Sequence, residues 1–70
     1  MRLKEIREEN NISQNTIAEI LHIKQNTYSQ YETGARQIPI DLLVSLAKYY
    51  NVSVDYLLEL TEIETPYPAK

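Results

Sequence analysis

The stretch SQNTIAEILHIKQNTYSQYETG, residues Ser13–Gly34, decides the fold of this 70-residue chain. Its apolar residues recur at steps of three and four, a spacing that predicts helices rather than strands. Ser13 is a good N-cap for a helix over residues 14–21, and a second helix is expected over residues 24–32. Gly34, the single glycine of the chain, can adopt the left-handed conformation that ends this second helix.

Only two residues, His22 and Ile23, separate the two predicted helices. The small Ala18 lies in the middle of the first helix, where it lets the two helices approach closely, and Ile23 places one apolar side chain in the turn. Two short helices joined in this way are the pattern of a helix-turn-helix, in which the second helix is offered to the major groove of DNA.

The remaining sequence predicts three further helices, over residues 2–9, 39–50 and 53–60. Asparagine or serine lies at their ends, as expected for residues that tolerate the left-handed conformation or cap a first turn. The expected fold class is therefore all-α, a compact five-helix bundle over residues 1–60. Residues 61–70 contain two prolines and are expected to form a flexible C-terminal tail.

The helix predicted over residues 39–50 supplies much of the expected core. Tyr49 and Tyr50 are adjacent, so one of the two should be buried and the other exposed, and Tyr50 is expected inside. The buried face of this helix is expected to use some set of Ile40, Leu43, Leu46, Ala47 and Tyr50.

The composition argues against an enzyme. One His and no Cys leave few nucleophiles and no cluster of metal ligands, so neither a metal site nor a cofactor is expected. The adjacent carboxylates Glu8 and Glu9 would point about 100° apart on a helix and cannot share a site. No apolar run reaches the length of a membrane span, and the first ten residues lack the apolar core of a signal peptide. A cytoplasmic protein without membrane contact is expected.

Three segments together, SQNTIAEIL, HIKQNTYSQYETG and RQIPIDLLVSLAKYYNVSVDYLL, resemble the phage repressor and Cro type of helix-turn-helix, the XRE family. The resemblance extends from residue 2 to about residue 60. It rests on Ser-Gln opening the first helix of the pair, Ala18 in its middle, Tyr-Glu-x-Gly closing the second, the proline of IPI, and Asn-Val-Ser between the last two helices. It implies a lambda-repressor-like fold and a sequence-specific transcriptional regulator, a small dimeric repressor that binds double-stranded DNA.

The resemblance also implies which residues read the bases. Gln25, Asn26 and Gln30 would face the base edges, and Thr27 and Ser29 would flank them, reaching a phosphate or a thymine methyl. Steps of four residues place the amides and hydroxyls on one helix face. An Asn or Gln amide can pair with adenine through two hydrogen bonds, each good pair giving about 1–3 kcal/mol of discrimination.

Phosphate contacts are implied around this face. Gln14, in the first turn of its helix, would bind a phosphate beside the helix N-terminus. Lys24 would place a cation near the phosphates, although it cannot cap the second helix as a small hydroxyl would. The amides near Thr33 and the side chain of Arg36 would hold the DNA backbone on the far side.

Two further positions carry structural roles in the resemblance. Arg7 and Glu32 lie where the family often has a partly buried ion pair, so Glu32 is interpreted as structural. The family usually has Gly in the turn between the paired helices, where this chain has His22. Histidine can adopt a positive φ at some cost, so the turn can form.

The net charge of −3 is unusual for a DNA-binding protein, because phosphate contacts dominate DNA affinity. Between residues 23 and 50 the three cations exceed the two carboxylates by one charge. Weak non-specific binding and dependence on a dimer are therefore expected, with recognition helices about 34 Å apart. The apolar residues near the C-terminus either form the dimer interface or complete the monomer core, and those assigned to the interface are Tyr56, Leu58, Leu60 and Ile63.

The alternative is a protein-interaction module, such as an antitoxin or accessory subunit with little DNA affinity of its own. The acidic charge and the tail EIETPYPAK favour this alternative, which adds a possible protein partner. The amide cluster over residues 25–30 favours DNA.

Overall fold

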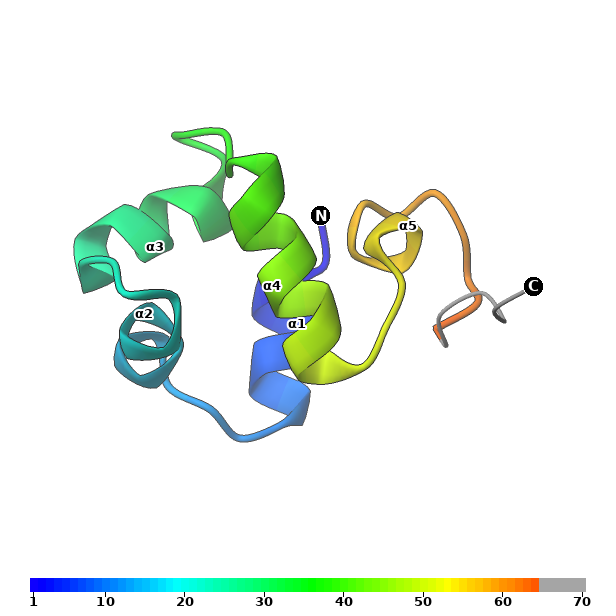
Figure 1. Ribbon diagram of the computed structural model, residues 1–70, viewed down its shortest axis with the longest axis horizontal. Helices are drawn as coiled ribbons and strands as arrows, with labels where there is room; N and C mark the ends of the chain where they lie inside the picture. The colour runs from blue at the N-terminus through cyan, green and yellow to red at the C-terminus, as the bar shows by residue number, and fades with distance from the viewer. Residues whose placement is uncertain (65–70) are drawn as a thin grey trace.

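The computed structural model describes residues 1–64, and these residues form five helices and no strand. The helices are α1 (Leu3–Glu9), α2 (Gln14–Leu21), α3 (Gln25–Thr33), α4 (Ile40–Tyr50) and α5 (Val54–Leu57). Figure 1 shows α2 and α3 side by side at one end of the molecule, α1 and α4 in the middle and α5 at the other end. The all-α prediction is confirmed, and the first four helices begin and end within one residue of their predicted bounds.

The core lies between α1, α2, α3 and α4 and is closed by α5. Its most deeply buried side chains come from all five helices: Leu3, Ile17, Tyr28, Leu46 and Leu57. Within α4, Leu43, Leu46 and Ala47 are buried as expected.

The expectation that Ile40 could belong to the buried set is wrong, because its side chain is 67% exposed. Ile40 is the first residue of α4, directly after the N-cap residue Pro39, and projects beyond the packed face. Tyr50 packs against the core while Tyr49 stays exposed, in agreement with the predicted pair, and the two rings meet edge to face at 5.2 Å.

Four of the helices end in the same backbone motif, and none of the four uses glycine. A residue with positive φ follows the helix, and it and the next residue donate backbone hydrogen bonds to carbonyls of the last turn, as in a Schellman motif. The residues with positive φ are Asn11, His22, Asn51 and Glu59, at 56°, 59°, 57° and 63°. Gly34 ends α3 with a φ of 83°, so the predicted glycine at this helix end is confirmed.

The residue that follows each positive-φ position is apolar. These four residues are Ile12, Ile23, Val52 and Leu60, and their N–H groups bond to the carbonyls five residues earlier at 2.9–3.1 Å. An apolar contact at this position commonly completes the motif. Ile12, Ile23 and Val52 pack into or against the core, whereas Leu60 is 73% exposed.

The fifth helix is shorter than predicted, since it covers Val54–Leu57 rather than residues 53–60. Ser53 caps its start as expected, accepting a hydrogen bond from the Tyr56 N–H at 3.0 Å. The left-handed Glu59 ends the helix after one turn. Glutamate is an ordinary helix residue, so nothing local in the sequence indicates this early end.

Residues 58–64 fold back onto the body of the protein after α5. Arg2 joins α5 and this segment to the N-terminus: its backbone N–H and its Nε donate to the carbonyls of Leu57 and Tyr56 in α5 at 2.9 and 3.0 Å, and its Nη2 donates to Glu62 in the segment at 3.1 Å. The guanidinium also lies 4.4 Å from the centre of the Tyr56 ring, a cation–π contact. The Ser53 N–H bonds to the Glu64 carbonyl at 3.0 Å. The predicted domain boundary at residue 60 stays a prediction, and residues 65–70 lie outside the described part.

Among residues 1–64, no helix combines the length and the hydropathy needed to cross a membrane.

The left-handed conformation of His22 generates a stability prediction. An L-residue in this region costs roughly 1–2 kcal/mol, whereas glycine adopts it freely but loses more entropy on folding. We expect His22→Gly to raise the free energy of unfolding by about 0.5–1 kcal/mol, measured by urea denaturation. His22→Ala is the control for loss of the exposed imidazole and should give no gain. Lower stability of His22→Gly would show that the imidazole matters more than the backbone.

Candidate nucleic-acid interface

Helix α3 divides into a buried aromatic face and an exposed polar face. Tyr28 and Tyr31 point inward, with exposed fractions of 0% and 9%. Gln25, Asn26 and Gln30 are exposed on the opposite side, in agreement with the predicted division of this helix. Thr27 and Ser29 are half-buried beside them. The two tyrosine rings thus fix the rotation of α3 about its axis, and this rotation decides which amides face outward.

Helix α2 packs against the buried side of α3. Ala18 is 1% exposed and Ile17 is fully buried, so the small residue lies where the two helices come close. The turn between them is tight because His22 is left-handed and the Ile23 N–H bonds back to the Ala18 carbonyl at 2.9 Å. The angle between α2 and α3 is therefore set by a hydrogen-bonded turn that packs Ile23 against the core.

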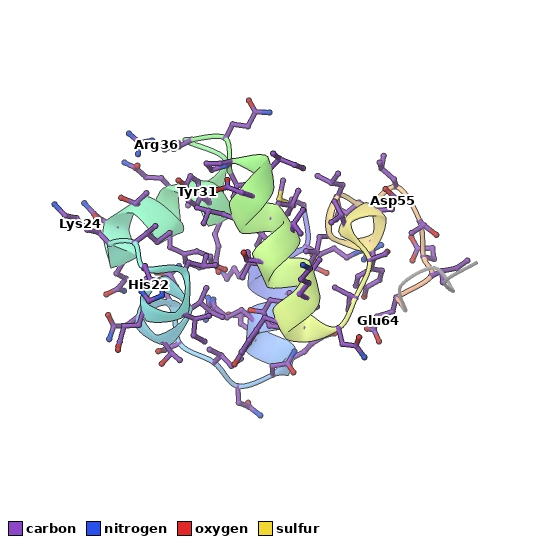
Figure 2. All side chains as sticks on the ribbon, viewed as in Figure 1. His22, Lys24, Tyr31, Arg36, Asp55 and Glu64 are labelled. Carbon is purple, nitrogen blue, oxygen red and sulfur yellow. The ribbon has the colours of Figure 1, made fainter. Side chains whose placement is uncertain are left out.

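Cationic side chains lie at both ends of α3. Lys24 is its N-cap residue, and an ammonium group cannot accept hydrogen bonds from the N–H groups of the first turn. Figure 2 shows Lys24 at the start of α3 and Arg36 in the loop beyond its end, both extending away from the body of the protein. The helix thus presents its partially positive N-terminus together with a cation.

A buried ion pair joins α1 to α3. The Arg7 Nε donates to Glu32 Oε2 at 2.6 Å and its Nη2 donates to Oε1 at 3.2 Å, a two-point contact. The two side chains are only 11% and 3% exposed. Arg7 also donates through Nη1 to the Ile12 carbonyl at 2.8 Å, so the guanidinium binds the turn between α1 and α2 as well.

Gln14 completes this cluster by donating from Nε2 to Glu32 Oε1 at 3.0 Å. The resemblance implies a phosphate contact for Gln14 and says nothing of this bond. An amide nitrogen carries two hydrogens, so the second N–H of Gln14 can still serve a phosphate while the first holds Glu32. The DNA contact of Gln14 stays a prediction, and the structure adds a bridging role between α2 and α3.

The ion pair shifts the pKa values of its members. Burial alone would raise the pKa of Glu32, but hydrogen bonds from Arg7 and Gln14, together with the Arg7 charge, hold it below its usual value of 4.5. The hydrogen bond to Glu32 raises the pKa of Arg7. Burial, reinforced by the Glu32 carboxylate, raises the pKa of Tyr28, so its hydroxyl stays protonated.

The hydroxyls of Tyr28 and Tyr50 are the two buried side-chain groups that lack a hydrogen-bond partner within residues 1–64. The Tyr28 hydroxyl lies near enough to Glu32 for each to influence the other's pKa, without the geometry of a hydrogen bond. The same part of the chain contains no group of His, Cys, Asp or Glu residues that could hold a metal ion.

The remaining candidate residues lie in two separate places. Thr33, in the last turn of α3, donates its hydroxyl to the Gln30 carbonyl at 3.2 Å and accepts the Ala35 N–H at 3.4 Å, so it shapes the loop that carries Arg36. The candidate dimer residues lie far from α3, in α5 and in the segment that follows it, at the opposite end of the bundle. Leu58, Leu60 and Ile63 are exposed there, while Tyr56 is half-buried beneath Arg2.

Comparison with known proteins gives one family match, the helix-turn-helix profile, over residues 3–57. Three Bacillus subtilis proteins are among the similar sequences. The uncharacterized HTH-type transcriptional regulator YobD is 38% identical over 65 residues, which cover 93% of this chain and 58% of that protein. The HTH-type regulators ImmR and AnsR are 44% identical over 62 residues and 37% over 57, covering 89% and 81% of this chain and 49% of each of those proteins.

This chain spans about half the length of the curated relatives that it matches. They are named as transcriptional regulators rather than as enzymes. No solved structure gives a significant match.

The buried pair predicts a large effect of removing one partner. Arg7→Ala leaves the Glu32 carboxylate buried without its cation, so we expect the free energy of unfolding to fall by about 3–5 kcal/mol in urea denaturation. The double variant Arg7→Met with Glu32→Leu should recover part of this loss, because two apolar side chains carry no desolvation cost while the Ile12 carbonyl and the Gln14 amide each lose a partner. A double variant no more stable than Arg7→Ala would contradict this account.

The lowered pKa of Glu32 predicts a dependence of stability on pH. Below about pH 4.5 the unfolded chain takes up a proton that the buried carboxylate resists, so stability falls as the pH drops toward the lowered folded-state pKa. Urea denaturation between pH 3 and 6 should show this fall in the wild type and a shallower one in Glu32→Gln. Equal slopes in the two proteins would assign the acid sensitivity to other carboxylates.

Proposed function

Because the chain belongs to the helix-turn-helix family, whose profile it matches over residues 3–57, we propose that it is a sequence-specific DNA-binding transcriptional regulator that reads the major groove with α3. The observation that carries the proposal is the exposed amide face of α3. Gln25, Asn26 and Gln30 project outward from a helix whose opposite face is locked by two buried tyrosines.

The amides suit base reading because each carries a donor and an acceptor on one planar group. This combination matches the N6 and N7 positions of adenine in the major groove. The helix is also rigid at its base: Tyr28 is fully buried, and Glu32 is bound by Arg7 from α1 and by Gln14 from α2. A rigid support keeps the amides in register with the bases, which is what discrimination by hydrogen bonds requires.

The phosphate contacts come from the edges of the same surface. Lys24 and Arg36 lie at the two ends of α3, and the second N–H of Gln14 lies at the start of α2. Few cations therefore meet the DNA backbone, in a chain whose net charge is −3. This favours weak non-specific binding and a shallow dependence of affinity on salt for one copy.

A second copy of the chain adds base contacts that compensate for the few phosphate contacts of one copy. The regulator acts as a homodimer, a small repressor whose two α3 helices read neighbouring half-sites. The support for a dimer is the exposed apolar set after α5, in which Leu60 and Ile63 are 73% and 59% exposed. Binding through two half-sites doubles the number of base contacts without raising the affinity of one copy for random DNA.

Substitution of a reading amide tests the proposal. Gln25→Ala should reduce the preference for the bound sequence over random DNA by roughly 5- to 150-fold, the equivalent of 1–3 kcal/mol. The sequence is first obtained by selecting duplexes from a randomised pool with the wild type, and binding is followed by fluorescence anisotropy. The melting temperature should not change, because Gln25 is exposed.

Two lysine variants provide the matched comparison. Lys24→Ala should weaken binding to all sequences alike and lower the slope of log affinity against log salt by about one. Lys4→Ala, on the exposed side of α1, should change neither quantity. If the folded wild type enriches no sequence from the pool at low salt, the proposal fails and the protein-interaction alternative takes its place.

A further inference from the structure

Leu60 differs from the apolar residues at the same position of the other three Schellman-like helix ends. In the other three motifs the apolar residue after the positive-φ position packs into or against the core, as Ile12, Ile23 and Val52 do. Leu60 makes the same backbone bond, to the Asp55 carbonyl at 2.9 Å, yet its side chain is 73% exposed. The backbone therefore presents a large apolar side chain outward at a position where this chain otherwise buries one.

The segment that carries Leu60 is fixed to the body of the protein at two places. Arg2 binds the carbonyls of Tyr56 and Leu57, directly before the segment, and the Glu62 carboxylate within it. The bond between the Ser53 N–H and the Glu64 carbonyl closes its far end. Residues 58–64 therefore form a preformed loop, the apolar loop, with Leu60 and Ile63 exposed. A preformed surface loses less entropy on binding than a flexible one.

An apolar groove lies next to this loop. It has a volume of about 490 Å³ and is lined by α4 and the start of α5, chiefly by Val44, Ala47, Val52 and Val54, with Lys48 among the lining residues. Ser53, whose N–H bonds to the end of the apolar loop, also lines the groove. The apolar loop and the groove therefore lie next to each other on the same molecule.

We infer that the groove receives the apolar loop of a second copy, so that Leu60 and Ile63 of each protomer fill the groove of the other. A two-fold dimer requires one surface that carries both halves of the contact, and the adjoining loop and groove meet this condition. The charges agree as well: Lys48 lies at the groove and the exposed Glu64 ends the loop, whereas Glu59 and Glu62 pair with the Met1 ammonium group and Arg2 of their own chain.

This arrangement rests on the dimer of the proposed function and specifies how it is built. A dimer in which the two loops pack only against each other would leave both grooves open to water. The reciprocal arrangement covers the loop and the groove in one step, and it lies at the end of the bundle opposite α2 and α3 (Figure 1), so both α3 helices stay free for DNA.

Cysteine cross-linking tests the pairing directly, because the natural chain contains no Cys and an introduced thiol is the only one. The Val44→Cys and Leu60→Cys variants of the 70-residue chain are mixed and oxidised, and the covalent dimer is analysed by mass spectrometry. The inference expects mainly the mixed species that joins position 44 of one copy to position 60 of the other. Ile40→Cys, one turn earlier on α4 and outside the groove lining, is the control and should give little mixed product with Leu60→Cys.

Sedimentation equilibrium gives the second measurement. Val44→Asp and Leu60→Asp should each raise the dimer dissociation constant at least tenfold, whereas Ile40→Asp should not. Preferential cross-linking of Leu60→Cys to itself, or a wild type that stays monomeric, would overturn the inference. DNA selection with the same proteins distinguishes failure of the interface from failure of the proposed function. A monomeric wild type that still enriches a half-site would contradict the interface and leave the proposed DNA binding intact.

Discussion

The buried contact between Arg7 and Glu32 is the constraint on which the rest of the structure depends. One guanidinium reaches Glu32 on α3 and the carbonyl of Ile12 in the turn between α1 and α2. Gln14 then ties α2 to the same carboxylate. The carboxylate of Glu32 thereby joins α1, α2 and α3 at one point. In a chain too short for a large apolar core, such a contact fixes relative orientation that packing alone would leave loose.

The support of α3 is aromatic and electrostatic rather than aliphatic. Its buried side chains are Tyr28 and Tyr31, and its third attachment is Glu32. Tyrosine rings fill space as well as aliphatic side chains do, but burial of the Tyr28 hydroxyl without a partner costs some stability. These contacts fix the rotation of α3 about its axis, although one of them leaves a buried hydroxyl unpaired. For a surface that must match a pattern of hydrogen bonds, the rotation matters more than this cost.

Local signals in the sequence predicted most of the fold. Ser13, Gly34 and Asn51 mark helix ends by their own chemistry, so α2, α3 and α4 were located from short stretches. The outward face of α3 followed from helical spacing once Tyr28 and Tyr31 were assigned to the core. Whether that face binds DNA is not a matter of spacing, and this part stays a proposal.

Contacts between distant residues could not be predicted from the sequence. The bond of Gln14 to Glu32 joins residues 18 apart, and that of Arg2 to Tyr56 joins residues 54 apart, so both depend on tertiary structure. The early end of α5 at Glu59 had no signal, because glutamate favours a helix and only the surrounding structure holds it left-handed. The exposure of Ile40 likewise depends on how α4 packs, not on its apolar character.

The sparse positive charge around α3 has a consequence for the search for a target. A regulator shares the cell with 10⁶–10⁹ competing sites, on the order expected for a genome, and each holds it through phosphate contacts alone. Lys24 and Arg36 flank α3 in a molecule whose other residues carry a net negative charge, so the proposed function implies that such encounters are brief. Under the proposed function most copies would then remain unbound and available, and a small number of molecules would suffice to keep a true site occupied.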